Sequence, residues 1–129
     1  MTMNKFTLSL ACLFLLGCSH DLHMMKTEEE MNSYGSAIRW GLFEKASDFQ
    51  PPDKRAALDT DFLKDIRVTS YDPKYRSEED GNSIVKQTVE IRYYHEQNSV
   101  EHSVTDRQTW RFDKEKDRWF LESGLPKFK

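Results

Sequence analysis

Between Val85 and His95 the chain alternates strictly, with apolar or bulky residues at every second position and polar or charged residues between them. This period of two is typical of a β-strand that buries one face. The inward face predicted by this pattern is Val85, Gln87, Val89, Ile91, Tyr93 and His95. An earlier and shorter alternation at Ile66, Val68 and Ser70 predicts a first strand, and the segment 72–83, with Pro73 and Gly81, reads as a polar loop.

Two turns then predict how the last strands pair. A two-residue turn at Asn98-Ser99 pairs Gln97 with Val100. The further pairs in that register are Tyr93 with Val104 and His95 with His102. A four-residue loop over 114–117 predicts the pairs Phe112 with Trp119 and Trp110 with Leu121, which gather four large apolar side chains on one face.

Upstream of the strands the apolar spacing changes to three and four residues, which is helical. Thr27 and Glu30 form a capping box, so we expect a helix to begin there. Its apolar stripe is Met31, Tyr34, Ile38 and Leu42, with Ala37 and Gly41 beside it and Phe49 further on. Trp40 and Phe43 lie off the stripe and either cover a rim of the core or meet a partner. Pro51 and Pro52 end this helix, and 53–63 reads as a short second one with Ala57, Leu58, Phe62 and Leu63 inward.

The first residues have the pattern of an export signal. Lys5 precedes an apolar run over 6–16, whose helical length of roughly 16 Å is about half of a ~30 Å hydrocarbon core. Leu15-Leu16-Gly17-Cys18 follows, and this sequence resembles the lipobox of bacterial lipoproteins. The alternative is an ordinary signal peptide with a chance cysteine.

The lipobox resemblance implies cleavage before Cys18 and acylation of that residue, which would anchor the protein in a membrane. The predicted organisation is a signal peptide over 1–17, a lipidated cysteine and tether over 18–26, and one domain over 27–129. Ser19 follows the cysteine where an aspartate would favour the inner membrane, so in a bacterium with two membranes we expect the outer membrane, facing the periplasm.

Composition narrows the list of partners. The 129 residues carry 19 Lys and Arg against 22 Asp and Glu, a formal charge of -3, so nothing favours binding to a nucleic acid. Both cysteines, Cys12 and Cys18, fall within the first eighteen residues and cannot form a disulfide within the predicted domain. The chain has no glycine-rich phosphate loop or cysteine–histidine cluster, and we expect no cofactor.

A long helix, a short helix and a curved antiparallel sheet of about four strands give an α+β class. This order, with the closing segments Trp110-Arg111-Phe112-Asp113, Trp119-Phe120-Leu121 and Ser123-Gly124-Leu125-Pro126, resembles the cystatin-like, nuclear transport factor two-like cone that ketosteroid isomerases share. In that family the long helix closes the concave face of the sheet. The resemblance implies a pocket that holds an apolar ligand, performs catalysis, or is filled by side chains.

Candidate pocket residues follow from the predicted inward faces. They are Tyr34, Gln87, Tyr93, His102, Asp106 and Gln108. Among them Asp106, His102 and Tyr93 are the candidate acid–base groups, because burial would raise an aspartate's pKa into a useful range. The structural alternative is a hydrogen-bonded polar patch of Asp106, Gln108 and Gln87, or a bulge that turns them outward. His95 facing His102 is a candidate metal pair, against the alternative of a solvated pair near a hairpin tip.

The function these observations favour is a lipid-anchored envelope protein that is not an enzyme and binds a protein partner or a small apolar ligand. The alternative is a small pocket enzyme of the ketosteroid isomerase type using Asp106, His102 and Tyr93. A cavity lined by these three residues would favour the ligand or the enzyme.

Overall fold

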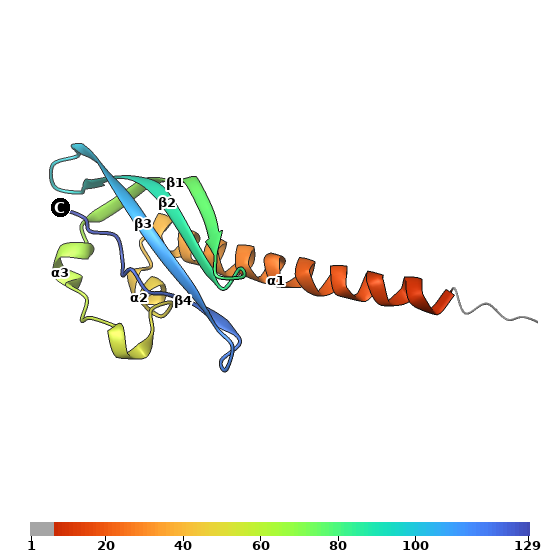
Figure 1. The fold of residues 1–129 in the computed structure, drawn as a ribbon. Coiled ribbons are helices and arrows are strands. Elements are labelled where there is room, and N and C mark those ends of the chain that lie inside the picture. The colour runs from red at the N-terminus through yellow and green to blue at the C-terminus, as the bar shows by residue number, and fades with distance from the viewer. Residues whose placement is uncertain (1–6) are drawn as a thin grey trace, which may run out of the picture. The chain divides into compact units, whose positions relative to one another are not determined.

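The protein is α+β, with a four-stranded antiparallel sheet and a few helices, in a computed structural model that describes residues 7–129 and, from residue 23 on, their side chains (Figure 1). The elements are α1 (Thr7–Arg39), α2 (Phe43–Ser47), the short 3-10 helix η1 (Pro52–Lys54), α3 (Thr60–Leu63), β1 (Ile66–Glu79), β2 (Ile84–His95), β3 (Glu101–Asp113) and β4 (Arg118–Leu121). The chain divides into two units, one up to Asn32 and one from Ser33 to Lys129, so α1 runs through the boundary.

The predicted helix start at Thr27 is wrong for this chain, because Thr27 lies inside α1. Its hydroxyl donates to the carbonyl of His23 at 2.9 Å, the backward bond of a threonine within a helix. The predicted tether over 18–26 also lies within α1, and residues 1–6 of the predicted signal peptide are outside the described residues.

The first helix ends at Arg39, twelve residues before Pro51, so the prediction of one helix up to the prolines is wrong. Gly41 has a φ of +71°, its N–H donates to Ile38, and the N–H of Leu42 donates to Ala37 at 2.8 Å. These two bonds form a Schellman cap, which needs a residue in the left-handed region. Gly41 is therefore a helix terminator rather than an interior residue, and Leu42 leaves the apolar stripe and is 50% exposed.

The glycine that lets the helix approach the sheet is Gly35. A Cβ built there would lie 2.7 Å from Cε1 of Tyr71 in β1, so only a glycine allows this contact. One turn later, Arg39 donates through NH1 to the carbonyl of Val68 at 2.6 Å. The last turns of α1 are thus tied directly to β1.

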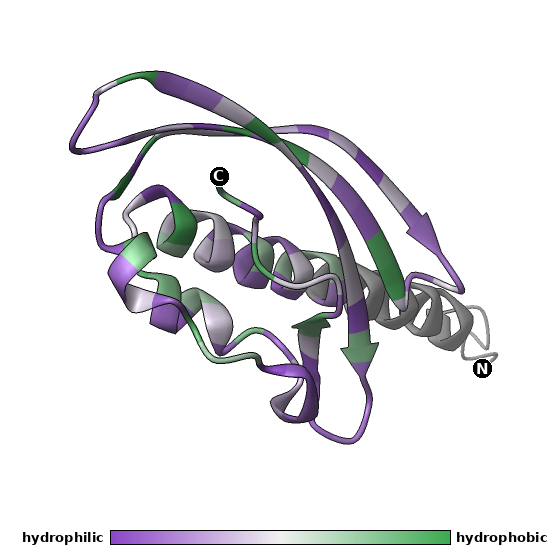
Figure 2. Cartoon of the chain, turned by 90° about the vertical axis from the view of Figure 1, so that its left-hand side faces the viewer, coloured by the Kyte–Doolittle hydropathy of each residue, from purple (hydrophilic) through white to green (hydrophobic). Residues whose placement is uncertain are grey.

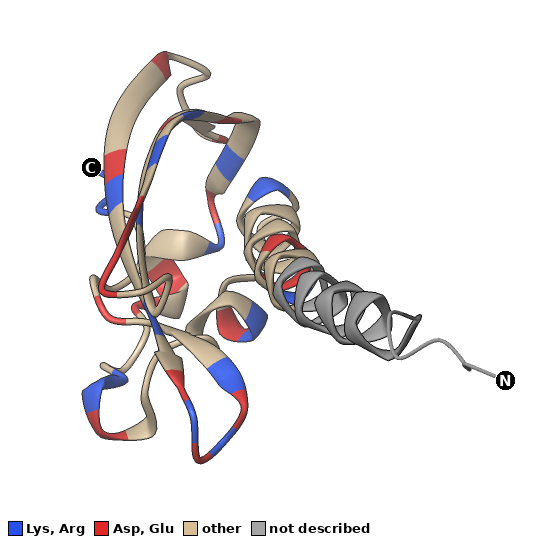
Figure 3. Cartoon of the chain, turned by 45° about the vertical axis from the view of Figure 1, so that its right-hand side comes forward, with Lys and Arg blue, Asp and Glu red and all other residues tan. Residues whose placement is uncertain are grey.

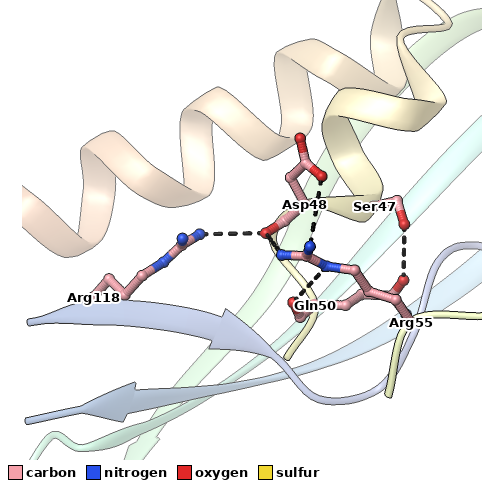
Figure 4. Close-up of polar contacts among 5 residues, drawn as sticks. All are labelled: Ser47, Asp48, Gln50, Arg55 and Arg118. Carbon is pink, nitrogen blue, oxygen red and sulfur yellow. Dashed lines mark hydrogen bonds and ion pairs between the residues drawn. The ribbon is translucent and has the colours of Figure 1, made fainter. Parts of the chain in front are cut away.

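The predicted second helix over 53–63 is also wrong, because only η1 and α3 are helical there. Asp59 caps α3 by accepting from the N–H of Phe62, while Ala57 is exposed and Leu58, Phe62 and Leu63 are half-buried. The chain before it is held by a small polar cluster (Figure 4). The residues of that cluster are Ser47, Asp48, Gln50, Arg55 and Arg118.

In that cluster Arg55 donates to the carbonyls of Asp48 at 2.9 Å and Gln50 at 3.1 Å (Figure 4). Arg118 of β4 reaches the same Asp48 carbonyl at 3.4 Å, and the N–H of Leu121 donates to Phe49 at 2.8 Å. The segment after α2 is therefore attached to the sheet edge at β4.

The sheet has the order β1-β2-β3-β4 with antiparallel neighbours throughout. β1 continues to Glu79, so the predicted polar loop over 72–83 is wrong except for its last four residues. Pro73 is tolerated because β1 is an edge strand, where a missing N–H need not break a ladder bond. The register with β2 shifts between Val68 and Ser70 and again between Pro73 and Tyr75, each shift adding one residue to β1.

The β2–β3 hairpin differs from the predicted register by two residues. Tyr93 pairs with His102, and Ile91 pairs with Val104. The turn is wider than a two-residue turn, because the N–H groups of Asn98 and Ser99 both donate to the carbonyl of His95, and Ser99 has a φ of +55°. The predicted cross-strand pair of His95 with His102 is therefore wrong.

The β3–β4 register is confirmed, with Phe112 opposite Trp119 and Trp110 opposite Leu121. In the unit from Ser33 to Lys129, the sheet curves over the helical segments (Figure 2). Apolar residues recur along its strands. Trp110 packs edge-to-face on Tyr34 and Phe49 at ring distances of 5.2 and 6.0 Å, which fills this part of the core. Charges of both signs are interspersed along the strands and at the hairpin ends (Figure 3).

Candidate functional site

A polar network lies in the middle of the otherwise apolar inner face of the sheet, and Gln108 is its centre. Its amide nitrogen donates to Oδ2 of Asp106 and to the hydroxyl of Tyr71, both at 2.9 Å. Its amide oxygen accepts from Nε1 of Trp110 at 3.0 Å and from Gln87 at 3.4 Å. Both polar ends of a buried amide are thereby satisfied.

The network reaches the sheet edge through Arg76. Register places Arg76, Gln87 and Gln108 side by side on β1, β2 and β3. Arg76 donates from Nε and NH2 to the amide oxygen of Gln87 at 3.2 and 2.9 Å. These bonds fit the structural alternative, a hydrogen-bonded polar patch in the sheet, and they show no outward turn of Asp106 or Gln108, which are 7% and 2% exposed.

Two ionisable groups in this region lie close together with unusual surroundings. Burial raises the pKa of Asp106, and the hydrogen bond from Gln108 opposes that shift. Burial, and then the charge of Asp106, raises the pKa of Tyr34 well above its ordinary value. The Tyr34 hydroxyl is buried and has no hydrogen-bond partner among the described residues. This corner of the core therefore holds a phenol that stays protonated and a carboxyl group whose pKa is raised by burial.

Tyr71 joins the same region from β1. Burial raises its pKa to about 12, against the opposing hydrogen bond from Gln108. Tyr71 falls between the predicted first strand and the predicted loop over 72–83, so the sequence did not identify it as a site residue. No periodic signal could have found it, because its position on the inner face depends on the register shifts in β1.

The other two predicted site residues lie in a different cluster. The Tyr93 ring stacks on His102 at 5.5 Å and meets Phe128 edge-on at 4.8 Å. Its hydroxyl accepts from the N–H of Lys129 at 2.9 Å. Nε2 of His95 lies 2.5 Å from the main-chain oxygen of Lys129, and the His95 and His102 rings are 5.8 Å apart.

The structure thus brings Tyr34, Gln87, Asp106 and Gln108 together and leaves Tyr93 and His102 outside that group. Among the contacts of the side chains described from residue 23 on, none joins Asp106 to His102. Across the same residues, no three His, Cys, Asp or Glu side chains converge to hold a metal ion. The acid–base set of Asp106, His102 and Tyr93 is therefore not assembled as one site.

An open groove of about 920 Å³ lies elsewhere, where the end of α1, α2, α3 and the start of β1 meet. Its apolar lining includes Trp40 and Leu42, which are 69% and 50% exposed, and the half-buried Leu58 and Leu63. The Schellman cap at Gly41 turns the chain between Trp40 and Leu42, so both of these neighbours line the groove. The volume falls within the ~300 to 1,000 Å³ typical of small-ligand sites.

The charged side chains of the groove have one dominant sign. Among the described residues that line it, the cations are Arg39, Lys45, Lys64 and Arg67, and the one acid is Glu44. The Arg39 guanidinium lies 4.6 Å from the centre of the Trp40 ring, a cation–π contact that holds both groups in place. In the sequence, the one feature that points to this site is the position of Trp40 off the apolar stripe of the predicted helix.

Comparisons of this chain with protein families, with curated proteins and with solved structures found no match. In the part of the chain that the structure describes, no helix is both long enough and apolar enough to cross a membrane.

Proposed function

We propose that this protein is a lipid-anchored protein of the bacterial cell envelope that is not an enzyme and that binds a small ligand with an apolar body. The observation that supports the binding role is the open groove beside Trp40 and Leu42. Two large apolar side chains exposed side by side in a concave site are typical of a surface that a ligand covers.

The anchor and the location rest on the sequence. The lipobox at Leu15-Leu16-Gly17-Cys18 supports lipidation at Cys18, and Ser19 supports the outer membrane facing the periplasm. The resemblance to the nuclear transport factor two-like cone is part of the same proposal. It is supported by the curved antiparallel sheet and by the ties of Gly35 and Arg39 to β1.

The enzyme alternative is less well supported by the geometry. Asp106 is committed to a hydrogen bond with Gln108, and Tyr34 fills the core beside Trp110 at 5.2 Å. The groove is lined by neither residue. A substrate in the groove would therefore not reach the buried carboxyl group.

The test is binding of N-phenyl-1-naphthylamine, an uncharged apolar dye whose emission rises on transfer out of water, to the full chain. We expect saturable binding that Trp40→Ala weakens roughly tenfold, because the indole supplies the largest apolar surface of the groove. The matched control is Tyr75→Ala, since Tyr75 is 76% exposed and lies outside the groove. Equal binding by all three proteins would contradict the proposed site.

A further inference from the structure

The groove differs in charge from the chain that forms it. The whole chain has a formal charge of -3, with acids more numerous than bases. Among the residues that line the groove the balance reverses, with four cations and one acid. A local positive potential on a negative protein favours an anionic ligand at this place and repels one elsewhere.

The four cations are not equally available. Arg67 bonds Glu96 at 2.8 Å, and Arg39 is held by Val68 and Trp40. Lys64 forms an ion pair with Asp61 at 3.8 Å, but both side chains are exposed, and exposed ion pairs contribute little stability. Lys45 takes part in none of the ion pairs within the part of the chain that the structure describes, and it is a lining residue of the same groove. Lys45 and Lys64 are therefore the cations that a ligand can engage at low cost.

We propose that the groove binds a single-chain amphiphile with an anionic head group. The apolar tail lies along Trp40, Leu42 and Leu63, and the head group meets Lys45 and Lys64, with the fixed guanidinium of Arg39 beside it. Charge complementarity argues for the anion, and the apolar residues with the small volume argue for one chain rather than a protein surface. This inference rests on the proposed binding function and specifies its ligand class.

The test compares dodecanoate, dodecyltrimethylammonium and dodecyl maltoside, which share one tail, below their micelle concentrations and on the full chain. We expect dodecanoate to displace N-phenyl-1-naphthylamine most effectively. Its affinity should fall when salt is raised, because the head group is held by screened charges in an open site. The affinity for dodecyl maltoside should not change with salt.

The variant Lys45→Gln/Lys64→Gln should bind dodecanoate about threefold to tenfold more weakly and bind the maltoside as before, as expected for two exposed charge contacts. The matched control, Lys54→Gln/Lys127→Gln, changes the net charge equally at two exposed lysines outside the groove. It should bind both amphiphiles normally. Thermal unfolding of both variants should match the parent, which separates a binding defect from a folding defect.

The outcomes distinguish the two proposals. Equal binding of the three head groups, or preference for the cation, overturns the anionic head group and leaves an apolar binding site. Binding to anionic phospholipid vesicles without binding of dodecanoate monomers also overturns it, since the groove would then contact a membrane surface. Failure of every amphiphile and of the dye overturns the proposed function itself.

Discussion

At the scale of single residues, two tyrosines, Tyr34 which is buried and Tyr71 which is half-buried, show how the same side chain can have opposite effects on stability. The hydroxyl of Tyr71 accepts a hydrogen bond from Gln108 at 2.9 Å. The hydroxyl of Tyr34 is buried without a partner among the described residues. A buried hydroxyl that makes no hydrogen bond has lost its contact with water and gained nothing in return.

We therefore predict that Tyr34→Phe keeps or raises the free energy of unfolding, by up to about 1 kcal/mol, because it removes an unsatisfied group and keeps the ring contacts with Trp110. Tyr71→Phe should lower it by about 1 to 2 kcal/mol, because Gln108 loses an acceptor inside the core. Urea denaturation of both variants measures the difference. If Tyr34→Phe is the more destabilised of the two, a partner for its hydroxyl exists.

Asp106 provides a residue-scale prediction that depends on pH. Burial raises the pKa of Asp106 in the folded protein above the ordinary 3.8. At a pH between the unfolded and the folded pKa, the folded protein therefore binds more protons than the unfolded chain. By linkage, the free energy of unfolding contributed by this group falls as pH rises through that window and stays constant above it. The cost of a buried carboxylate is thus present at neutral pH and absent in acid.

Asp106→Asn removes this titration and keeps an oxygen that can accept from Gln108. We predict that the stability of this variant relative to the parent increases as pH rises from about 4 and then levels off. Urea denaturation across pH 3 to 8 measures it. The exposed Asp53→Asn controls for the loss of one negative charge, and a pH-independent difference for Asp106→Asn would show that its carboxyl group is not desolvated.

At the scale of elements, sequence periodicity predicted the buried faces better than the ends of the helices. The stripe of Tyr34, Ala37 and Ile38 is buried as predicted. The spacing continues to Leu42, but the chain has already left the helix there because Gly41 forms the cap. A glycine that is not followed closely by a proline can lie inside a helix or end it. The backbone hydrogen bonds that make Gly41 a helix terminator are seen only in the structure.

The first strand could not be predicted beyond its first few residues. Only Ile66 and Val68 of β1 are buried, and the remainder of this edge strand is half-buried or exposed on both faces. Such a segment has no hydrophobic period and is a strand because it bonds to β2. Pro73 strengthened the wrong interpretation, because a proline in a polar segment indicates a loop unless the partner strand is known.

The error of two residues in the predicted β2–β3 register changes which residues face each other, but not which side of the sheet they lie on. A shift of two residues keeps every side chain on its face, since the period of a strand is two. The inward positions of Gln87, Asp106 and Gln108 were therefore predicted correctly from a wrong register. The pairing of His95 with His102 depended on the register itself and was lost.

The groove could not be predicted because its lining comes from separate parts of the chain, which are the end of α1 with α2, the segment around α3, the start of β1, and Tyr94 of β2. None of these parts has a recognisable motif. Trp40 lies off the predicted apolar stripe and is 69% exposed, so the pattern does mark it as a side chain outside the core. The same pattern predicts that its neighbour Leu42 is buried, so the sequence does not indicate that Leu42 is exposed in the groove.

At the scale of the whole molecule, the groove and the proposed anchor residue belong to different units of the chain. The groove lies in the unit from Ser33 to Lys129, and Cys18 lies in the unit that ends at Asn32. We therefore expect the proposed ligand binding and the proposed membrane attachment to be separable, each removed by its own substitution.

We predict that Cys18→Ser, made in the full chain, abolishes incorporation of radiolabelled palmitate and removes the protein from the outer-membrane fraction. Acylation places several chains on one residue, and at ~0.8 kcal/mol per buried CH₂ two chains already give stable attachment. The matched control is Cys12→Ser, which changes the other cysteine of the chain and should keep both the label and the location. Dye binding to the groove should be unchanged in both variants, because no cysteine lines it. Palmitate labelling that survives Cys18→Ser, or outer-membrane attachment without it, would contradict the anchor.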